Sequence, residues 1–169
     1  MKTDDLPVGL QPGEAGACLL VERTPSAQHR GAKPLARVSG VATGLERDHR
    51  FSGKVNPGIA LAECMREVLE RISPSAAFEG AVYLDLNGEQ WRAQEWGMAQ
   101  VRFNPRLREP SVQLTAVTVG DTGAASGALG ACLAIHDLTR NHNRSGQAHV
   151  VSSSHWGDVG CLALHSADE

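Results

Sequence analysis

A run of small residues from position 119 to position 134 constrains this chain more than any other stretch. A β-rich segment, residues 112–119, leads into a glycine turn, and the residues that follow are almost all Gly, Ala, Ser or Thr. Each glycine inside a helix costs about 1 kcal/mol relative to alanine, so such a helix depends on close packing. Small residues recur at three- and four-residue spacing, which places on one face Gly123, Gly127, Gly130, Ala131 and Ala134. We predict a buried central helix that contacts another element almost backbone to backbone.

The start of this helix carries Asp121 and Thr122. A short side-chain oxygen there accepts a backbone N–H of the first turn, which makes either residue a suitable N-cap. The glycines lack the G-x-G-x-x-G spacing of a dinucleotide-binding turn, and no lysine follows them as in a phosphate-binding loop. Packing therefore explains the glycines better than phosphate binding.

Length and charge restrict the class of protein. The 169 residues fit a single domain, with residues 1–12 as an extended lead-in. The net charge is −3 and the basic residues are scattered, so we expect no nucleic-acid partner. No apolar run approaches the roughly eighteen residues of a membrane span, and the polar, acidic N-terminus does not resemble a secretion signal. These features predict a cytoplasmic protein.

Cysteine and histidine spacing gives no metal signature. Each of the four cysteines lies in an apolar run, far from the others and without C-x-x-C spacing, namely Cys18, Cys64, Cys132 and Cys161. We predict buried free thiols in a reducing compartment. No two of the seven histidines have H-x-x-x-H spacing, and the alternation around His149 and His165 suggests that both face water. The sequence predicts neither a metal nor a cofactor.

Hydrophobic patterning predicts alternating strands and helices. Strands are expected at 16–22, 35–41, 81–86, 112–119, 148–152 and 160–164, with the first two paired across a polar connection at 23–34. Residues 43–56 are expected to form a loop. Helices are expected from Pro57 to residue 72, over 89–102 and from about 122 to 140, with Trp91, Trp96, Met98 and Val101 as the apolar positions of the second helix. This order predicts an α/β fold with a parallel or mixed sheet and helices on its faces.

Four segments resemble, in the correct order, motifs of the β-ketoacyl synthases. Residues 13–22, G-E-A-G-A-C-L-L-V-E, resemble that family's glycine-rich strand G-E-G-A-G-A-L-V-L-E, and residues 30–36, R-G-A-K-P-L-A, resemble the A-R-G-A-x-x-L-A segment after it. Residues 120–127, G-D-T-G-A-A-S-G, resemble G-H-T-x-G-A-A-G, and residues 153–160 lie where the family has S-F-G-F-G-G-T-N. The resemblance implies the C-terminal half of a thiolase-like fold: a mixed, mostly parallel sheet of about five strands, helices on both faces and a central Gly/Ala-rich helix.

The family's catalytic residues are replaced at the matching positions. Asn87 stands where the first histidine of an N-A-H-G-T-G-T turn is expected, and Asp121 replaces the second histidine. The lysine position is Ala116, while Trp156 and His155 alter the turn that carries the gating phenylalanine. The nucleophilic cysteine of the family belongs to its N-terminal half, and none of the four cysteines here lies at a matching position.

These replacements argue against condensation. In a decarboxylating condensation two neutral histidines donate hydrogen bonds to the oxygen that gains negative charge, and an ionised Asp121 would oppose that charge. Because the equivalent loops meet in the family, Asn87, Asp121 and His155 could converge. An Asp–His pair acting as general base is one interpretation. The interpretation that the sequence favours is that Asp121 caps the helix and His155 is a loop residue.

The resemblance also implies incompleteness. In the family two pseudo-repeated halves pack their central helices together, so one half alone would expose the small-residue stripe. We therefore predict a second thiolase-like half as partner, supplied by a separate chain, a second copy or a longer product. Our hypothesis is a bacterial, non-catalytic scaffold, adaptor or inactive subunit, accessory to a secretion or biosynthetic cluster. The alternatives are half of a split β-ketoacyl-thioester synthase or acyltransferase whose cysteine lies on the partner, and binding of an acyl-carrier or coenzyme A thioester without turnover.

Overall fold

In the residues that the structure describes, five strands form one mixed sheet. The computed structural model describes residues 9–72, 77–103, 106–108, 110–143 and 145–167. The strands follow the order β1-β5-β4-β2-β3 across the sheet, and their bounds are β1 Ala36–Leu45, β2 Ala81–Leu84, β3 Ser111–Leu114, β4 Gln147–Ser153 and β5 Asp158–Ser166. β2 is parallel to β3 and β4, whereas β5 is antiparallel to β4 and β1. Four strands therefore run in one direction and β5 in the other, which confirms the mixed, mostly parallel sheet.

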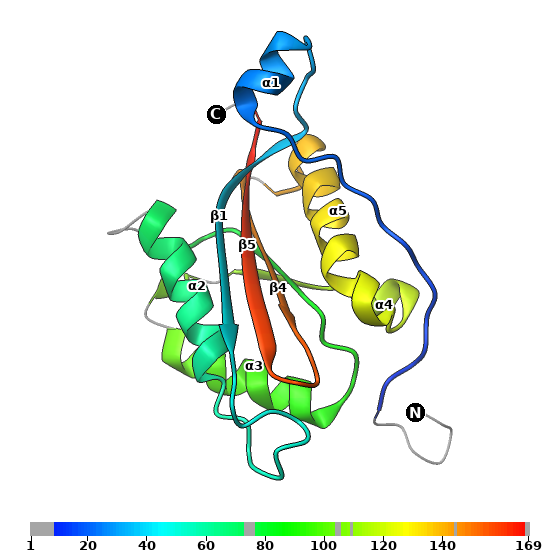
Figure 1. Ribbon diagram of the computed structural model, residues 1–169, viewed down its shortest axis with the longest axis vertical. Helices are drawn as coiled ribbons and strands as arrows, with labels where there is room; N and C mark the ends of the chain where they lie inside the picture. Colours follow the sequence, from blue (N-terminus) through cyan, green and yellow to red (C-terminus); the bar gives the residue numbers. More distant parts are fainter. Residues whose placement is uncertain (1–8, 73–76, 104–105, 109, 144, 168–169) are drawn as a thin grey trace.

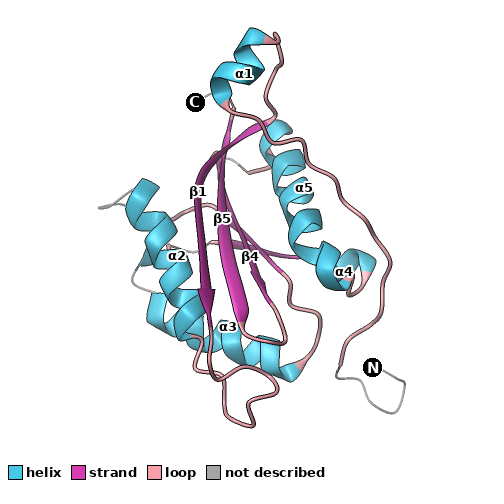
Figure 2. Ribbon diagram, in the orientation of Figure 1, coloured by secondary structure: helices cyan, strands magenta, loops and turns pink. Residues whose placement is uncertain are grey.

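Helices cover both faces of this sheet, as predicted. Helices α2 (Ile59–Ile72) and α3 (Gln90–Phe103) lie on one face, and α5 (Ser126–Thr139) lies on the other (Figure 1, Figure 2). The short helices are α1 (Thr24–His29), α4 (Thr115–Val119) and the 3-10 turn η2 (Gly123–Ala125). In the described part of the chain, no helix has the length and apolar character needed to cross a membrane.

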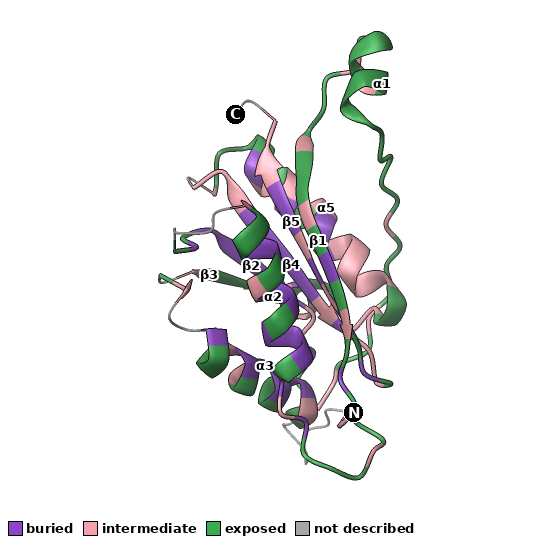
Figure 3. Cartoon of the chain, turned by 60° about the vertical axis from the view of Figure 1, so that its left-hand side comes forward, coloured by how far each residue is buried: buried purple, intermediate pink, exposed green. Residues whose placement is uncertain are grey.

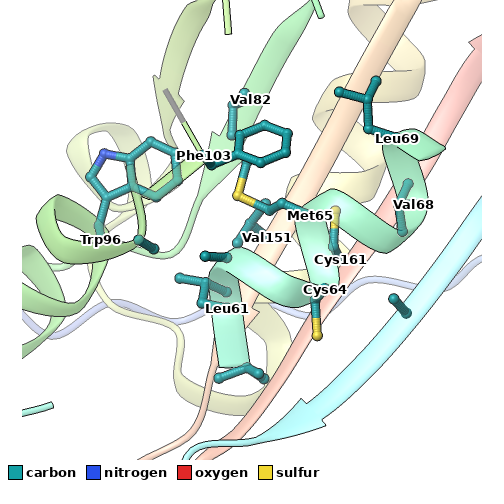
Figure 4. Packing of buried hydrophobic residues seen from close by; sticks show 14 of the residues in the cluster. Leu61, Cys64, Met65, Val68, Leu69, Val82, Trp96, Phe103, Val151 and Cys161 are labelled. Atoms are coloured by element: carbon teal, nitrogen blue, oxygen red, sulfur yellow. The ribbon is translucent and has the colours of Figure 1, made fainter. Parts of the chain in front are cut away.

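The α2/α3 face holds the larger core. Alternate residues of β2, β4 and β5 point to this face, and α2 buries its apolar stripe against them. Figure 4 shows Met65 and Leu61 of α2 beside Val151, Trp96 and Phe103. The start of α2 is capped by a residue distant in sequence, because the buried Glu46 carboxylate accepts the backbone N–H groups of Ile59 and Ala60 at 3.0 and 3.2 Å.

The opposite face is built from small residues around α5. A Cβ added at Gly130 would lie 3.1 Å from Cγ1 of Val150 on β4, and one at Gly127 would lie 3.6 Å from Cβ of Ser152. The absence of side chains therefore lets α5 lie close to its own sheet. The prediction that the stripe awaits another chain is corrected accordingly: Gly130, Ala131 and Ala134 are buried within this chain, whereas Gly123 is exposed and Gly127 half-buried.

The expected first strand is the largest error in the fold prediction. Residues 16–22 form no strand, and they do not pair with β1. This segment runs extended along the outer side of α5, and much of it is exposed (Figure 1, Figure 3). Leu20 is 80% and Val21 73% exposed. Apolar β-formers make a strand only where another strand offers hydrogen bonds, and β1 pairs instead with β5.

Smaller corrections concern local structure. The predicted strand at 112–119 is divided into β3 and α4, and the polar connection at 23–34 contains α1, with a proline at the start of that helix. His149 was expected to face water, but it is 2% exposed and stacks on Phe78. On α3, Trp96 is buried, whereas Met98 and Val101 are exposed. Among the cysteines, Cys64 and Cys161 are buried as predicted, but Cys18 is exposed and Cys132 half-buried.

Candidate functional site

Residues singled out from the sequence gather at one edge of the sheet. Asn87 follows β2, Asp121 follows α4, and His155 and Trp156 form the turn between β4 and β5. The parallel strands β2, β3 and β4 all end at this edge, so the loops that follow them lie together there. This edge is where open α/β sheets bind ligands.

Asn87 joins two carboxylates. Its Nδ2 donates to Oδ2 of Asp121 at 2.9 Å and to Oε2 of Glu89 at 3.1 Å, and its Oδ1 accepts the Glu89 backbone N–H at 3.0 Å. The Asn87 side chain is buried, at 7% exposure. An amide nitrogen carries two hydrogens, so both hydrogens of Asn87 are directed at carboxylates.

Glu89 is the centre of the charged network. Its Oε2 lies 3.4 Å from Nε2 of His155, and its Oε1 lies 3.2 Å from Nη2 of Arg50. Burial alone would raise the pKa of Glu89, but hydrogen bonds from Asn87 and His155 and the charge of Arg50 outweigh it and lower the pKa below the usual value. Glu89 is therefore held as a carboxylate.

A second ion pair lies beneath this layer. Arg92 Nη1 lies 2.7 Å from Oδ2 of Asp85 and also donates to the backbone oxygen of Ser153 at 2.6 Å. Asp85 in turn accepts hydrogen bonds from the Ser152 hydroxyl at 2.8 Å and the Ser153 backbone N–H at 2.9 Å. Since both charged side chains are about nine-tenths buried, this pair fixes the end of β2 to the end of β4.

Aromatic side chains surround the network on its outer side. Phe51, in the loop between β1 and α2, packs on Trp156 with ring centroids 4.8 Å apart and on His155 at 5.9 Å. Trp91 of α3 lies 5.2 Å from His155. Phe51 and Trp156 are 55% and 67% exposed. This exposed aromatic pair is a surface that a partner or a ligand could cover.

The lead-in segment completes the site. The backbone N–H of Gly13 donates to the backbone carbonyl oxygen of Asp121 at 2.9 Å, and the backbone N–H of Asp121 donates to the backbone carbonyl oxygen of Gln11 at 2.7 Å. A hollow of about 510 Å³ lies alongside, between Gly9, Leu10, Arg50 and the start of α3. Residues 11–13 are thus tied to the turn that carries Asp121, although the chain beyond them is exposed.

Asp121 also acts as a local cap. Its Oδ1 accepts the Gly123 backbone N–H at 2.9 Å, while Thr122 Oγ1 lies 3.0 Å from the Ser126 hydroxyl. The first residue before α5 is Ala125, which has no side-chain cap. The capping interpretation is therefore right for the turn and wrong for the helix itself. Asp121 contacts Asn87 and His155 contacts Glu89, so both lie against the Asn87–Glu89 pair.

The polar groups of this site stabilise carboxylates that the protein itself supplies. They are not arranged to stabilise a negative charge that forms on a substrate. Asp85, Glu89 and Asp121 contribute three carboxyl groups at the sheet edge, balanced by arginines and His155. The two buried thiols differ from an activated nucleophile: burial raises the pKa of Cys64 to about 11, with a further increase from neighbouring glutamates, and burial also raises the pKa of Cys161. Ala116, at the lysine position, lies half-buried in α4.

Sequence reasoning missed Asp85, Glu89 and the two arginines that face them. A signal was present, because polar residues follow directly after the four buried residues of β2, at Asp85, Asn87 and Glu89. Polar side chains at the carboxyl end of a buried strand are typical of a ligand-binding site. The arginines carry no such signal, since Arg50 lies in a loop and Arg92 is one of several charged residues on α3.

Solved structures with the same architecture establish the fold. The type II polyketide synthase complex AntDE:AntF, an acyl-carrier protein with its ketosynthase bound to the hexaketide, matches with a TM-score of 0.73 and 17% identity. The chain has the ketosynthase fold. The ishigamide ketosynthase/chain length factor matches with a TM-score of 0.60 and 24% identity, and a β-ketoacyl synthase from Burkholderia phymatum STM815 with a TM-score of 0.65 and 18% identity.

The ketosynthase-like chain corresponds to part of these proteins. Each match covers 86% of this chain, but only 42%, 38% and 41% of the respective neighbours. The chain therefore spans less than half the length of the ketosynthases it resembles. No protein-family model matches the sequence, and no curated protein matches it.

Proposed function

We propose that this protein is a non-catalytic ketosynthase-like subunit that pairs with a second thiolase-like half as a scaffold, adaptor or inactive partner. The observation that carries the proposal is the use of both Asn87 amide hydrogens by the carboxylates of Glu89 and Asp121. A condensing site needs donors free to face a developing oxyanion. At this edge of the sheet the donor is already occupied, and Asp121 adds a negative charge.

Pairing is supported by the surfaces that the single chain leaves uncovered. The segment at 16–22 has the composition of a buried strand, yet Leu20 and Val21 are among its most exposed side chains. Leu133, on the outer side of α5, is 38% exposed. We propose that residues 16–22 add as a strand to the sheet of the partner, which would supply the missing hydrogen bonds and cover the apolar side chains.

The solved neighbours suggest the classes of partner. One contains a ketosynthase with a chain length factor, and another contains a ketosynthase with its acyl-carrier protein. By analogy, the partner here would be a thiolase-like half, either a separate chain or a second copy, and an acyl-carrier or coenzyme A thioester would be a bound ligand. A cytoplasmic role in a bacterial secretion or biosynthetic cluster belongs to the same proposal.

A second candidate function is half of a split β-ketoacyl-thioester synthase or acyltransferase whose nucleophilic cysteine lies on a partner chain. The contacts of Asp121 and His155 with the Asn87–Glu89 pair favour this candidate, because they bring a carboxylate and an imidazole to one place. In that case Asp121 and His155 would have to act in the assembled site, and Asp121→Ala would lower turnover.

The test is to purify the chain alone and with the product of a neighbouring reading frame that encodes an N-terminal half. We expect a complex by solution mass and no turnover of malonyl- or acyl-thioesters. Turnover by the mixture would replace the scaffold proposal with the split enzyme. Val21→Asp should abolish the complex, whereas Val101→Asp, on the exposed side of α3 and 75% exposed, is the matched control and should leave it intact.

A further inference from the structure

A group of metal-ligating side chains lies at the far end of α5, away from the site above. His136 and Asp137 are in the last turn of the helix, and His142 is in the turn that follows. One ligand atom from each of the three side chains lies within 4.8 Å of the other two, the one such group of three in the described part of the chain. The sequence did not indicate it, because the H-D-x₄-H spacing resembles no helical ligand pair.

The distances suit a tetrahedral ion. Oδ1 of Asp137 lies 3.4 Å from Nδ1 of His136 and 3.4 Å from Nδ1 of His142. Zinc binds imidazole nitrogen and carboxylate oxygen at about 2.0–2.2 Å, so two neighbouring ligand atoms of a tetrahedral zinc ion are about 3.3–3.6 Å apart. The two imidazole rings meet edge to face, with centroids 6.1 Å apart, and each offers a ring nitrogen within 4.8 Å of the other.

A buried tyrosine fixes the carboxylate. Tyr83, 2% exposed, donates its phenol hydrogen to Oδ2 of Asp137 at 2.6 Å. This contact leaves Oδ1 directed at the two histidines. Metal-ligating carboxylates are commonly held in this way by a hydrogen bond from behind, which reduces the freedom lost on binding.

The backbone holds the third ligand in place. The His142 N–H donates to the Asp137 backbone oxygen at 3.0 Å, and Asn141 adopts a positive φ of 56° that turns the chain back after α5. Asparagine tolerates this conformation better than most residues. His142 is therefore positioned by a defined turn and not by a long loop.

A cavity borders the cluster at Asp137 and His142. It measures about 330 Å³ and is lined by Asp137 and His142 together with Tyr83, Gln113 and Asn143. Two histidines and one carboxylate with an open fourth position form a common arrangement for zinc and related divalent ions. We propose that His136 Nδ1, Asp137 Oδ1 and His142 Nδ1 bind a divalent transition-metal ion, with Zn²⁺ the best fit and a water molecule from the cavity as the fourth ligand.

The competing explanation is a pair of protonated histidines attracted to Asp137. Hydrogen bonds from Tyr83 and the histidines hold the pKa of Asp137 below its usual value, despite an opposing effect of burial, so the carboxylate is available to either partner. The two explanations differ in solution. Metal binding needs neutral histidines, so protons compete with the ion for the ring nitrogens, whereas an ion pair needs the protonated rings.

The experiment is a titration of the tag-free, chelator-treated full chain with Co²⁺ by visible absorption and with Zn²⁺ by calorimetry. We expect one equivalent, the intense visible bands of tetrahedral Co²⁺, displacement by Zn²⁺ and loss of binding at low pH. His142→Gln and Asp137→Asn should each lower affinity at least tenfold, and Tyr83→Phe should lower it about tenfold.

Two controls separate this site from adventitious binding. His29→Gln removes an exposed histidine of α1, and Cys18→Ser with Cys132→Ser removes the two thiols outside the core; both proteins should bind as the wild type does. Binding that persists in His142→Gln, binding that disappears with the thiols, or no saturable binding by wild type would each overturn the proposal. Because His136 and His142 are exposed, their substitution leaves the core intact, and Co²⁺-induced shifts of their ring protons provide a second readout on the wild-type chain.

Discussion

The two faces of the sheet are packed in different ways, one with large side chains and the other with small ones. The α2/α3 face is filled by large side chains, among them Met65, Phe78 and Phe103, each at most 1% exposed. The α5 face has one aromatic side chain in its buried cluster, Tyr83, and otherwise depends largely on alanines and on Gly130. The α2/α3 face is therefore filled by the volume of its side chains, whereas on the α5 face the backbones of helix and sheet approach each other closely.

The helices on the two faces also differ in the size of the side chains that they pack on the sheet. Large side chains on α2 and α3 complete a core that lies within the chain, with both helices packed on each other as well. On the other face α5 uses its small residues for its own sheet and leaves Leu133 exposed on its outer side. Mutational effects should therefore differ between the faces.

The largest expected effect is the loss of a large side chain from the α2/α3 face. Met65 is fully buried between the sheet and α3, so Met65→Ala leaves a cavity that the rigid strands cannot close. We expect a loss of about 3 kcal/mol in the free energy of unfolding, measured by urea denaturation. Val101→Ala, at an exposed position of α3, is the control. A loss below about 1 kcal/mol for Met65→Ala would mean that this face is not tightly packed.

The sequence predicted helices better than strand partners. Period and capping signals around residues 57–72 and 89–102 are local, and the structure confirms both helices as α2 and α3. The segment at 16–22 has strand composition but no strand, because pairing depends on which neighbour is present. The sequence did not predict the burial of His149 either, because its imidazole stacks on Phe78, which precedes β2 and is distant in sequence.

The candidate site was predicted only in part, because some of its contacts join residues that no sequence motif connects. Asn87 and Asp121 were predicted from their positions in the ketosynthase-like motifs. In the structure Nδ2 of Asn87 lies 2.9 Å from Oδ2 of Asp121. Glu89, which links Asn87 to His155 and Arg50, lies two residues after Asn87 in the same turn, where the family motif has no acidic residue. The cluster of His136, Asp137 and His142 depends on a single turn after α5, and sequence spacing alone does not reveal that turn.

The next effect tests the one imidazole enclosed in the α2/α3 core. Burial, with a smaller contribution from His165, lowers the pKa of His149 to about 4 from a usual 6.5. Between these values the unfolded chain binds more protons than the folded chain, so stability falls as the pH drops below 6.5. We expect a loss of about 2 kcal/mol between pH 8 and pH 5 from this residue.

The variant His149→Phe should remove that part of the pH dependence. Urea denaturation at a series of pH values measures it, and His29→Gln, which removes an exposed imidazole, should keep the wild-type slope. His149 Nδ1 has no hydrogen-bond partner among the described residues, so phenylalanine loses no hydrogen bond of that nitrogen. An unchanged slope in His149→Phe would show that His149 is hydrated in solution and that the core on this side is looser than the structure indicates.

The smallest effect compares one glycine from each face. At Gly97 on α3 an added Cβ meets nothing within 4 Å, whereas at Gly130 on α5 it lies 3.1 Å from Val150. Gly97→Ala gains helix propensity alone and should stabilise the chain by about 1 kcal/mol. Gly130→Ala gains the same propensity but crowds a stiff β-branched side chain on a central strand. We therefore expect a net loss of about 1 kcal/mol, so that the same substitution has opposite signs on the two faces in thermal denaturation. Equal stabilisation by both alanines would mean that α5 can move away from the sheet, and the contrast between a face filled by volume and a face filled by close approach would no longer hold.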